Sequence, residues 1–491
     1  MLQKRIMLAL LGGAMLSFSA CDDLLDTEPR QSVSSEVALT DITGVRAVLN
    51  SVYDRLQVNT YYGAQMMLAP DVMADNLRQT TPNSNRYTFF QNNTQGLAIW
   101  GTAYAAINEV NFVIKGIETA TTTEAEKSQI RGEAHFLRAL LYFDLARIYG
   151  YEPGKEVSGW NLSAVLRLTP TASLADADMR ERSTNVAVYT QIESDLGVAI
   201  KNLVAPSTSA AHFRGNKAAA EALMSRVSLY QGKWQQALDN AKAALATKGF
   251  TTAAGGGVTA TSVGTSGLTS KANYVNAFKT QPNPESLFEL RYIQATESLG
   301  SNESLHSLTS TFTTGAWGDI VPTAELYNLY EAGDVRKNMY YSPATPPAGV
   351  PSTPKETGLV YSQKYSATGG AFTDNIPLFR TSELYLIKAE AEAELNNLTD
   401  ALLDLNALRL RSGASVIVET DKGTIIDKIL VERRLELAFE GHRFFDLKRR
   451  GLPIDKQDPT PSLDYSNFRV LSAIPADQVT LNPKIKQNPG Y

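Results

Sequence analysis

Cysteine and histidine, the residues most often used for disulfides and metal sites, are scarce in this 491-residue chain. Its single cysteine cannot form a disulfide within the chain, and its four histidines lie far apart in the sequence. The Gly-x-Ser-x-Gly pattern of a nucleophile elbow and the Gly-x-x-x-x-Gly-Lys-Ser/Thr pattern of a phosphate loop are also missing. We therefore expect no metal, no cofactor and no catalytic residue, and we expect that the protein is not an enzyme.

Basic residues are too few for a protein that binds nucleic acid. The chain has 46 Lys and Arg against 51 Asp and Glu, which gives a formal net charge of -5. Binding of a phosphate backbone requires clustered basic side chains, so we expect no nucleic acid among the partners. A glycosidase, however, needs only two carboxylates, which 51 acidic residues could supply without a recognisable motif. A surface glycoside hydrolase therefore stays as an alternative function.

Long apolar runs are missing except at the start of the chain. Lys4 and Arg5 precede an apolar run at residues 6–16, and the small residues Ser19 and Ala20 follow it. A basic region, a short apolar region and small residues in this order are typical of an export signal. The run is shorter than the roughly 20 residues that span a bilayer. We therefore interpret residues 1–20 as a signal peptide.

The only cysteine, Cys21, comes directly after these small residues. This arrangement resembles a bacterial lipoprotein signal, which implies that Cys21 carries diacylglycerol and a further acyl chain such as palmitate. Phe18 departs from the usual leucine, and an ordinary signal followed by a free cysteine is the alternative. Residues 21–34 begin with a strongly acidic stretch, which we expect to be a solvated tether. This stretch resembles the signal that sends some lipoproteins to the outer face of the outer membrane.

Helical periodicity dominates the rest of the chain. Apolar residues at helical spacing predict helices within residues 45–56, 100–114, 130–148, 188–203, 218–230, 234–245, 383–395, 402–410 and 424–440. A capping box from Thr123 to Glu126 opens the third of them. Strand signals are few, and the clearest are at residues 287–292 and 416–418. The sequence thus predicts a mainly α fold with few short strands.

The helices are expected to form pairs, with long irregular loops between some of them. Ala222, Gly232, Trp234 and Ala237 follow the spacing of tetratricopeptide helix pairs, in which small residues let helices approach closely. Ordinary helical hairpins with alanine at close contacts are the alternative. Two stretches predict surface loops, since residues 251–270 hold five glycines without a charged or aromatic residue and residues 341–358 hold five prolines.

The helix expected at residues 424–440 contains a conflict between charge and position. Arg433 and Glu440 fall on its apolar face by spacing, and a buried charge must be paired. The two residues are two turns apart, so each should find its partner on another helix. Glu133, Arg138 and Glu390 are the partners that we expect. Since such networks in helical cores are usually structural, we interpret this one as a structural charge network and not as an active site.

The same region carries a set of motifs that resemble one protein family. The run from Glu432 to Gly451 resembles the C-terminal signature of the SusD/RagB family of outer-membrane nutrient-binding lipoproteins. Further matches follow the family order at residues 132–150, at Pro322, Leu326, Tyr330, Asp334 and Arg336, at 380–391 with 406–413, and at Ile474, Pro475 and 487–491. The resemblance covers most of the chain from about residue 33 onwards.

This resemblance implies a single SusD-like domain at residues 35–491, with an N-terminal part at about 35–250 and a C-terminal part at about 271–491. It implies tetratricopeptide-like helix pairs as the scaffold and long irregular loops that contact the ligand. It also implies a binding function without chemistry. The lipoprotein would face the cell exterior, capture an oligosaccharide or, in some members, a peptide, and deliver it to a SusC-type TonB-dependent transporter. A tetratricopeptide scaffold for several soluble proteins is a third alternative.

Aromatic residues in loops are the first candidates for ligand contact, because sugar rings stack their apolar faces on aromatic side chains. Trp317 is flanked by two glycines and Trp160 follows a glycine, so we expect both in loops and choose them as candidates. Trp100 and Trp234 belong to helical patterns and are expected in the core. Loop anchoring is the alternative role for Trp317.

Polar candidates come from the early segment at residues 75–87. Sugar hydroxyl groups need amide, carboxylate and guanidinium partners, and this segment is rich in such residues. Binding sites of the resembled family often draw on this early region, so we choose Asp75, Asn76, Arg78 and Tyr87. A plain polar surface loop is the alternative.

Overall fold

The computed structural model describes residue 39 and residues 41–81, 83–172, 178–250, 266–311, 313, 315–342, 358–456 and 462–491. The signal peptide, Cys21 and the whole expected tether at 21–34 lie outside the described residues, as do most of the two loops expected at 251–270 and 341–358. No helix in the described part is both long enough and apolar enough to cross a membrane.

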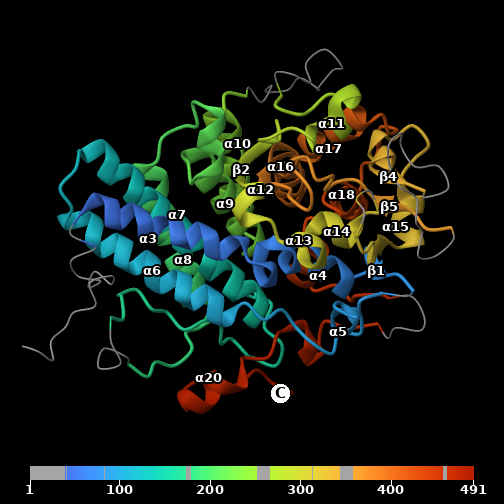
Figure 1. Ribbon diagram of the computed structural model, residues 1–491. Coiled ribbons are helices and arrows are strands. Elements are labelled where there is room, and N and C mark those ends of the chain that lie inside the picture. The colour runs from blue at the N-terminus through green and yellow to red at the C-terminus, as the bar shows by residue number, and fades with distance from the viewer. Residues whose placement is uncertain are drawn as a thin grey trace, which may run out of the picture.

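Four pairs of long helices form the scaffold, which confirms the mainly α fold (Figure 1). The pairs are α3 (Ile42–Gln57) with α6 (Trp100–Thr119), α7 (Glu124–Tyr149) with α8 (Asn185–Asn202), α9 (Lys217–Tyr230) with α10 (Trp234–Thr247), and α16 (Thr381–Glu394) with α17 (Leu398–Ser412). Each pair packs on the next, through α6 on α7, α8 on α9 and α10 on α16. The pairs therefore stack in sequence order.

Local sequence explains why these helices start and pack as they do. The Thr123 side chain caps α7 by accepting a hydrogen bond from the backbone N–H of Glu126, as the capping box predicts. Alanines fill the contact between α9 and α10, and Ala218, Ala237 and Ala241 are completely buried. Small side chains allow two helix backbones to approach closely, which is the packing that the repeat pattern predicts.

The charged C-terminal helix is shorter than its sequence pattern predicts. The helix α18 spans Lys422–Glu436, and α19 follows at Arg443–Arg450. Phe439 and Gly441 have positive φ angles of 68° and 74°, so the chain turns between the two helices. A Cβ atom at Gly441 would lie 1.9 Å from the carbonyl oxygen of Met66, so only glycine fits there. Glu440 therefore lies in a turn and not on the helix.

Short strands form three antiparallel pairs. The pairs are β1 (Leu77–Gln79) with β3 (Ile320–Pro322), β2 (Ser286–Leu290) with β6 (Ile376–Arg380), and β4 (Tyr340–Tyr341) with β5 (Tyr361–Ser362). The strand predicted at 287–292 is confirmed by β2, whereas the strand predicted at 416–418 is wrong. There the Asn406 side chain bonds the N–H and the carbonyl of Ile417 at 2.7 and 2.9 Å, in place of a partner strand.

Short helices and irregular segments cover the side of the scaffold that carries β1, β4 and β5 (Figure 1). The short helices of the whole described chain are η2 (Asn59–Gly63), α4 (Gln65–Met73), α5 (Thr88–Gln91), η4 (Ser209–Phe213), η5 (Lys271–Asn273), α11 (Tyr274–Ala277), α12 (Gln294–Glu297), α13 (Gly300–Glu303), α14 (Leu305–Thr309), α15 (Ala324–Leu329), η6 (Val335–Met339), η7 (Phe468–Val470) and α20 (Ala476–Leu481). Trp100 is buried in the core as predicted, and Trp234 is partly buried against it.

Candidate functional site

Pairing of β1 with β3 brings together two segments that the sequence analysis chose separately. Arg78 lies opposite Val321 in this antiparallel pair. The N–H of Thr80 donates to the carbonyl of Asp319 at 2.8 Å, and its hydroxyl donates to the carbonyl of Gly318 at 3.2 Å. The early polar segment and the loop that carries Trp317 are therefore neighbours in space, although most of the scaffold separates them in sequence.

The indole of Trp317 is partly exposed and is held in one orientation by its neighbours. Its Nε1–H donates to Oδ1 of Asn302 at 3.1 Å, and its backbone N–H donates to the carbonyl of Ser307 at 2.9 Å. The guanidinium of Arg86 lies against the ring, with Cζ 5.0 Å from the ring centroid. A ring that is already fixed loses little conformational freedom when a ligand stacks on it.

Arg86 is held in turn by the buried carboxylate of Asp319. Nη1 of Arg86 lies 3.8 Å from Oδ2 of Asp319, whose side chain is 1% exposed. The hydroxyl of Ser84 also donates to this carboxylate, and the backbone N–H of Ser84 does so at 3.2 Å. We call the set Trp317, Arg86, Asn302 and Asp319 the Trp317 surface. It combines an aromatic ring with amide and guanidinium groups, which is the combination that sugar rings and their hydroxyl groups require.

Three members of the Trp317 surface, Arg86, Asn302 and Asp319, were missed by the sequence analysis, and Asp319 lies only two residues after Trp317. Arg86 lies within the early polar segment, next to Tyr87. The polar composition of that segment was therefore the signal that could have identified Arg86. Asn302 belongs to the short helix α13 and has no local pattern that points to Trp317. Its role follows only from the packing of α13 beside the Trp317 loop.

Asp75 and Asn76 point into the protein and fix the C-terminal part of the fold. Nε and Nη2 of Arg443 donate to the two carboxylate oxygens of Asp75 at 2.7 and 2.9 Å. Nε of Arg434 donates to Oδ1 of Asn76 at 2.8 Å. Burial alone would raise the pKa of Asp75, but the hydrogen bonds and charges of these arginines hold it below its ordinary value. The structure thus gives both candidates structural contacts.

The remaining candidates of the early segment differ in exposure. Tyr87 is 3% exposed, and its ring packs against Phe90 with centroids 5.6 Å apart. Arg78 is partly exposed on β1, and its Nη1 donates to the carbonyl of Gln79 at 2.9 Å. Arg78 is therefore placed at the surface beside the Trp317 loop, whereas Tyr87 is a core residue.

Trp160 lies in a loop, as predicted, but it contacts the C-terminal end of the chain. Its Nε1–H donates to Oδ1 of Asn488 at 3.1 Å. Arg182 donates to the same oxygen at 2.8 Å, and Asn488 donates to the carbonyls of Tyr149 and Ser472. These contacts are those of a loop anchor that holds the C-terminal segment on the helix scaffold.

Arg433 is buried, the Glu440 side chain is 7% exposed, and both are paired, but their partners are not those predicted. Nε of Arg433 donates to the two carboxylate oxygens of Asp446 at 3.1 and 3.0 Å. Glu440 accepts from Nε of Arg380 at 2.8 Å and from Nζ of Lys364 at 2.5 Å. Helical spacing alone predicted the wrong partners for these two residues. Glu440 lies in the turn after α18, and Asp446 lies on the next helix, α19.

The predicted partners form ion pairs elsewhere in the scaffold. These pairs are Glu133 with Arg214 at 2.8 Å, Arg138 with Asp195 at 2.6 Å, and Glu390 with Arg449 at 2.5 Å. Of these three residues, Glu390 alone is connected to Arg433, and the connection is indirect. Arg449 pairs with Glu390 and also donates from Nε to Asp446 at 2.9 Å, and Asp446 is the partner of Arg433. The prediction that Glu133 and Arg138 pair with Arg433 or Glu440 is therefore wrong.

The centre of the network is Glu436, which the sequence analysis did not choose. Arg336, Arg380 and Arg411 approach its carboxylate at 3.2, 3.3 and 2.8 Å. Burial alone would raise the pKa of Glu436, but the charges of these arginines hold it far below its ordinary value. All four side chains are buried, so the network joins α17, α18, β6 and η6 inside the protein.

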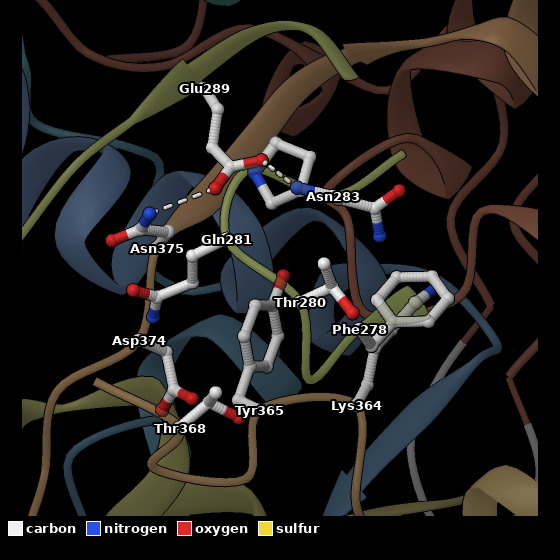
Figure 2. Close-up of a pocket in the computed structure, with 11 residues that line it drawn as sticks. Phe278, Thr280, Gln281, Asn283, Glu289, Lys364, Tyr365, Thr368, Asp374 and Asn375 are labelled. Atoms are coloured by element: carbon white, nitrogen blue, oxygen red, sulfur yellow. Dashed lines mark hydrogen bonds between the residues drawn. The ribbon is translucent and has the colours of Figure 1, made fainter. Parts of the chain in front are cut away.

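A small polar cavity lies beside this network (Figure 2). Its empty volume is about 300 Å³, including the solvent at its mouth, and its walls carry the carboxyl groups of Asp374 and Glu289. Burial raises the pKa of Asp374 to about 7 and also raises that of Glu289. Both oxygens of Glu289 are occupied, since they accept from the Asn283 N–H at 2.8 Å and from Nδ2 of Asn375 at 2.9 Å (Figure 2). Glu289 therefore holds the cavity wall together.

Two family models match the sequence on either side of the Trp317 loop. The model described as the SusD family matches residues 333–491. The model described as starch-binding associating with outer membrane matches residues 23–229. The chain belongs to the SusD family. A mainly α SusD-like fold is therefore established by sequence and structure together.

Known SusD-like proteins match along nearly the whole chain. A SusD-like protein of Formosa agariphila, P2, is 25% identical and aligns with 97% of this chain and 98% of its own length. One from Bacteroides ovatus is 24% identical over 88% of this chain and 80% of its own. The crystal structure of a SusD superfamily protein from Bacteroides thetaiotaomicron has a TM-score of 0.78 and 25% identity, with 91% of this chain and 100% of that chain aligned. A laminarin-binding SusD-like protein has a TM-score of 0.71 and 24% identity, with 92% and 100% aligned.

The matched ranges divide the Trp317 surface of this SusD family member. Arg86 lies inside the N-terminal range, and the Glu436 network lies largely in the C-terminal one. Trp317, Asn302 and Asp319 lie between the two ranges. Most of the scaffold, though not α10, thus lies within the ranges that match the family models, while Trp317 lies in the segment that they leave out.

Within the described residues, no group of three or more histidine, cysteine, aspartate or glutamate side chains is arranged to hold a metal ion. The arrangement at the Trp317 surface is suited to recognition, because its carboxylate is buried and already paired with Arg86.

Proposed function

We propose that this SusD family member is a cell-surface lipoprotein that binds an oligosaccharide at the Trp317 surface and delivers it to a SusC-type TonB-dependent transporter. The description of one family model, starch-binding associating with outer membrane, supports a glycan ligand and a membrane setting. A solved protein of the same fold is named for laminarin binding, which supports a glucan as the ligand class.

The observation that carries this proposal is the fixed, partly exposed indole of Trp317. Asn302 bonds its Nε1–H and Arg86 lies against its ring. A sugar ring gains dispersion and hydrophobic contact by stacking on such an indole, and little entropy is lost because the indole is already ordered. Asn302 and Arg86 lie at the ring, where their polar groups are within reach of sugar hydroxyls.

The proposed setting follows from the N-terminal sequence. Cys21 would carry the lipid, residues 21–34 would form the tether, and residues 35–491 would form one binding domain outside the cell. Two or three acyl chains give durable anchoring. The transporter partner would receive the ligand from a lipoprotein that sits over its barrel.

Binding and turnover measured together test the proposal. Isothermal titration of the purified chain without its lipid, against laminarin and soluble starch, is expected to give binding with one of them. Release of new reducing ends over the same period is expected to stay at the buffer level. Appearance of new reducing ends would support the glycoside hydrolase in place of the binding protein.

Variants identify the site. Trp317→Ala is expected to lose affinity, whereas Trp160→Ala, the matched tryptophan that contacts Asn488, is expected to keep it. Equal loss of affinity in both variants would place binding elsewhere. Peptide binding without glycan binding would favour the peptide-binding alternative.

Co-purification tests the partner. The lipidated protein, extracted from its own membrane in mild detergent, is expected to bring down one large barrel transporter. Recovery of several soluble proteins and no barrel would favour the tetratricopeptide scaffold.

A further inference from the structure

Several buried polar atoms without a hydrogen-bond partner belong to α9, to α18 and to His442, the residue before α19. In the described part of the chain these include Nη1 and Nη2 of Arg433, Nδ1 of His442 and the hydroxyl of Tyr230. Arg433, His442 and Tyr230 are only 1%, 7% and 3% exposed. Buried polar groups are nearly always satisfied, so such a group in a native protein calls for a bound water or ion.

Contacts through Asp446 and Arg449 link Arg433 to Tyr230. Asp446 accepts from Nε of Arg433 at 3.1 Å and from Nε of Arg449 at 2.9 Å. The guanidinium of Arg449 lies 5.7 Å from the ring centroid of Tyr230. His442 is the residue directly before α19, which carries both Asp446 and Arg449. Arg433 and Tyr230 are thus linked through Asp446 and Arg449.

Several buried arginines lie near His442. Burial is the largest cause of its pKa lying well below the ordinary value, and the charges of Arg226, Arg433, Arg147 and Arg380 follow as the next causes. The guanidinium of Arg147 also lies close by, 4.2 Å from the ring centroid of Phe445 in the first turn of α19. Cations from α7, α9, α18 and β6 therefore surround the position of His442.

The chemistry of the unpartnered atoms selects the kind of group that would satisfy them. The outer nitrogens of Arg433 carry four N–H bonds and cannot accept a hydrogen bond. A tyrosine hydroxyl can donate, and so can a neutral imidazole in one tautomer. The neighbouring arginines Arg147, Arg226 and Arg380 already form ion pairs with carboxylates, so the unmet need is for an acceptor at the outer nitrogens of Arg433, which a small anion can supply to several N–H groups at once. Leaving charged donors buried without an acceptor is costly.

We propose that a monovalent halide, chloride under ordinary conditions, binds inside the protein to the outer nitrogens of Arg433, next to His442 and Tyr230. The ion links α18 to α9 and to the start of α19, and so it stabilises the junction between the scaffold and the C-terminal helices. The site is separate from the Trp317 surface and does not depend on the glycan-binding proposal.

Crystallography of the wild-type protein with bromide tests the site directly. Crystals grown in sodium bromide, with data collected at the bromine absorption edge, are expected to show an anomalous peak within hydrogen-bond distance of Nη1 or Nη2 of Arg433. Density for water without anomalous signal at this position, or no density at all, would overturn the proposal.

Thermal unfolding supplies a second test in solution. Sodium chloride and sodium bromide are expected to raise the Tm of the wild-type protein by roughly 1–2 °C per tenfold increase above the dissociation constant, relative to sodium gluconate of equal ionic strength. Arg433→Met is expected to lose this halide dependence, and Arg131→Met, which removes a surface arginine paired with Glu118, is expected to keep it. An equal response of the wild-type protein to all three salts would count against the site. The diffraction test needs no variant, so it decides the question even if Arg433→Met does not fold.

Discussion

The guanidinium of Arg86 lies against the indole of Trp317, with Cζ 5.0 Å from the ring centroid. The contact joins the early polar segment to a loop in the middle of the chain, and it depends on the pairing of β1 with β3. Arg86 in turn is fixed by Asp319, which lies two residues after Trp317. The aromatic ring and its polar neighbours are therefore positioned before any ligand arrives.

Replacement of Trp317 by alanine is expected to weaken glycan binding at least tenfold, which corresponds to about 1.4 kcal/mol. The loss follows from removal of the stacking ring. The Tm is expected to change little, because the indole is partly exposed and lies outside the main core. Titration calorimetry and thermal unfolding of the same preparation check both parts. Retained affinity with a clear loss of Tm would identify Trp317 as a loop anchor.

Arg86→Ala is expected to weaken glycan binding by about threefold, since a cation–π contact at an exposed site contributes about 0.5–1 kcal/mol. The cause is a less firmly oriented indole, together with the loss of a donor for sugar hydroxyls. Arg131→Ala, which removes another surface arginine in an ion pair, serves as the control. If Arg86→Ala binds as tightly as this control, Arg86 has no part in recognition.

Trp160→Ala is expected to lower the free energy of unfolding by roughly 2 kcal/mol, in line with truncation of a partly buried aromatic side chain. Its indole N–H holds Asn488, and Asn488 ties the C-terminal segment to the carbonyls of Tyr149 and Ser472. Urea unfolding measures the change. Trp160→Phe restores ring packing without the hydrogen bond, and it should recover part of the loss. An unfolding midpoint equal to that of the wild type would show that the segment needs no such anchor.

Glu436→Gln is expected to lower the free energy of unfolding by about 3–5 kcal/mol, because it removes one partner from a buried charge network. Arg336, Arg380 and Arg411 would keep their charges without the carboxylate that they share. Asp427→Asn removes an exposed carboxylate from the same helix and is the matched control. Chemical denaturation of the two variants side by side gives the answer, and similar midpoints would mean that the arginines are compensated by other groups.

Glu392 makes stability depend on pH. Burial, together with the neighbouring Asp404 carboxylate, raises its pKa to about 8. The folded protein therefore keeps this proton up to about pH 8, while the unfolded chain releases it near pH 4.5. Stability must then fall as pH rises between these values, because the folded state binds the extra proton.

Replacement of Glu392 by glutamine is expected to flatten this fall between pH 5 and pH 8. Glu124→Gln, at a side chain that is 86% exposed, should leave the dependence unchanged. Urea unfolding of the three proteins at several pH values measures the slope. Parallel curves for the wild type and Glu392→Gln would contradict the raised pKa.

Local patterns in the sequence were sufficient to locate the long scaffold helices, but not the short ones or the end of α18. The capping box at Thr123 and the alanines of α9 and α10 act through neighbours along the chain or through one adjacent helix, so their effects could be recognised without tertiary structure. The family motifs also come from the sequence, and the matches on both sides of the Trp317 loop agree with them.

Only the tertiary structure decided which side chains meet. The spacing of Arg433 and Glu440 required partners for both, but a turn at Phe439 and Gly441 sends Glu440 to Arg380 and leaves Arg433 to Asp446. Side-chain partners depend on contacts between distant segments, and helical periodicity carries no information on those contacts.

The helical stripes determined a mainly α fold from sequence alone, and the acidic balance gave the expectation that nucleic acid is not a partner. The Trp317 surface could not be assembled in the same way, because it needs β1 beside β3 and α13 beside the loop. Periodicity reports which face of an element is buried, whereas a binding surface is made by the relative placement of several elements, and that placement is fixed only when the whole core packs.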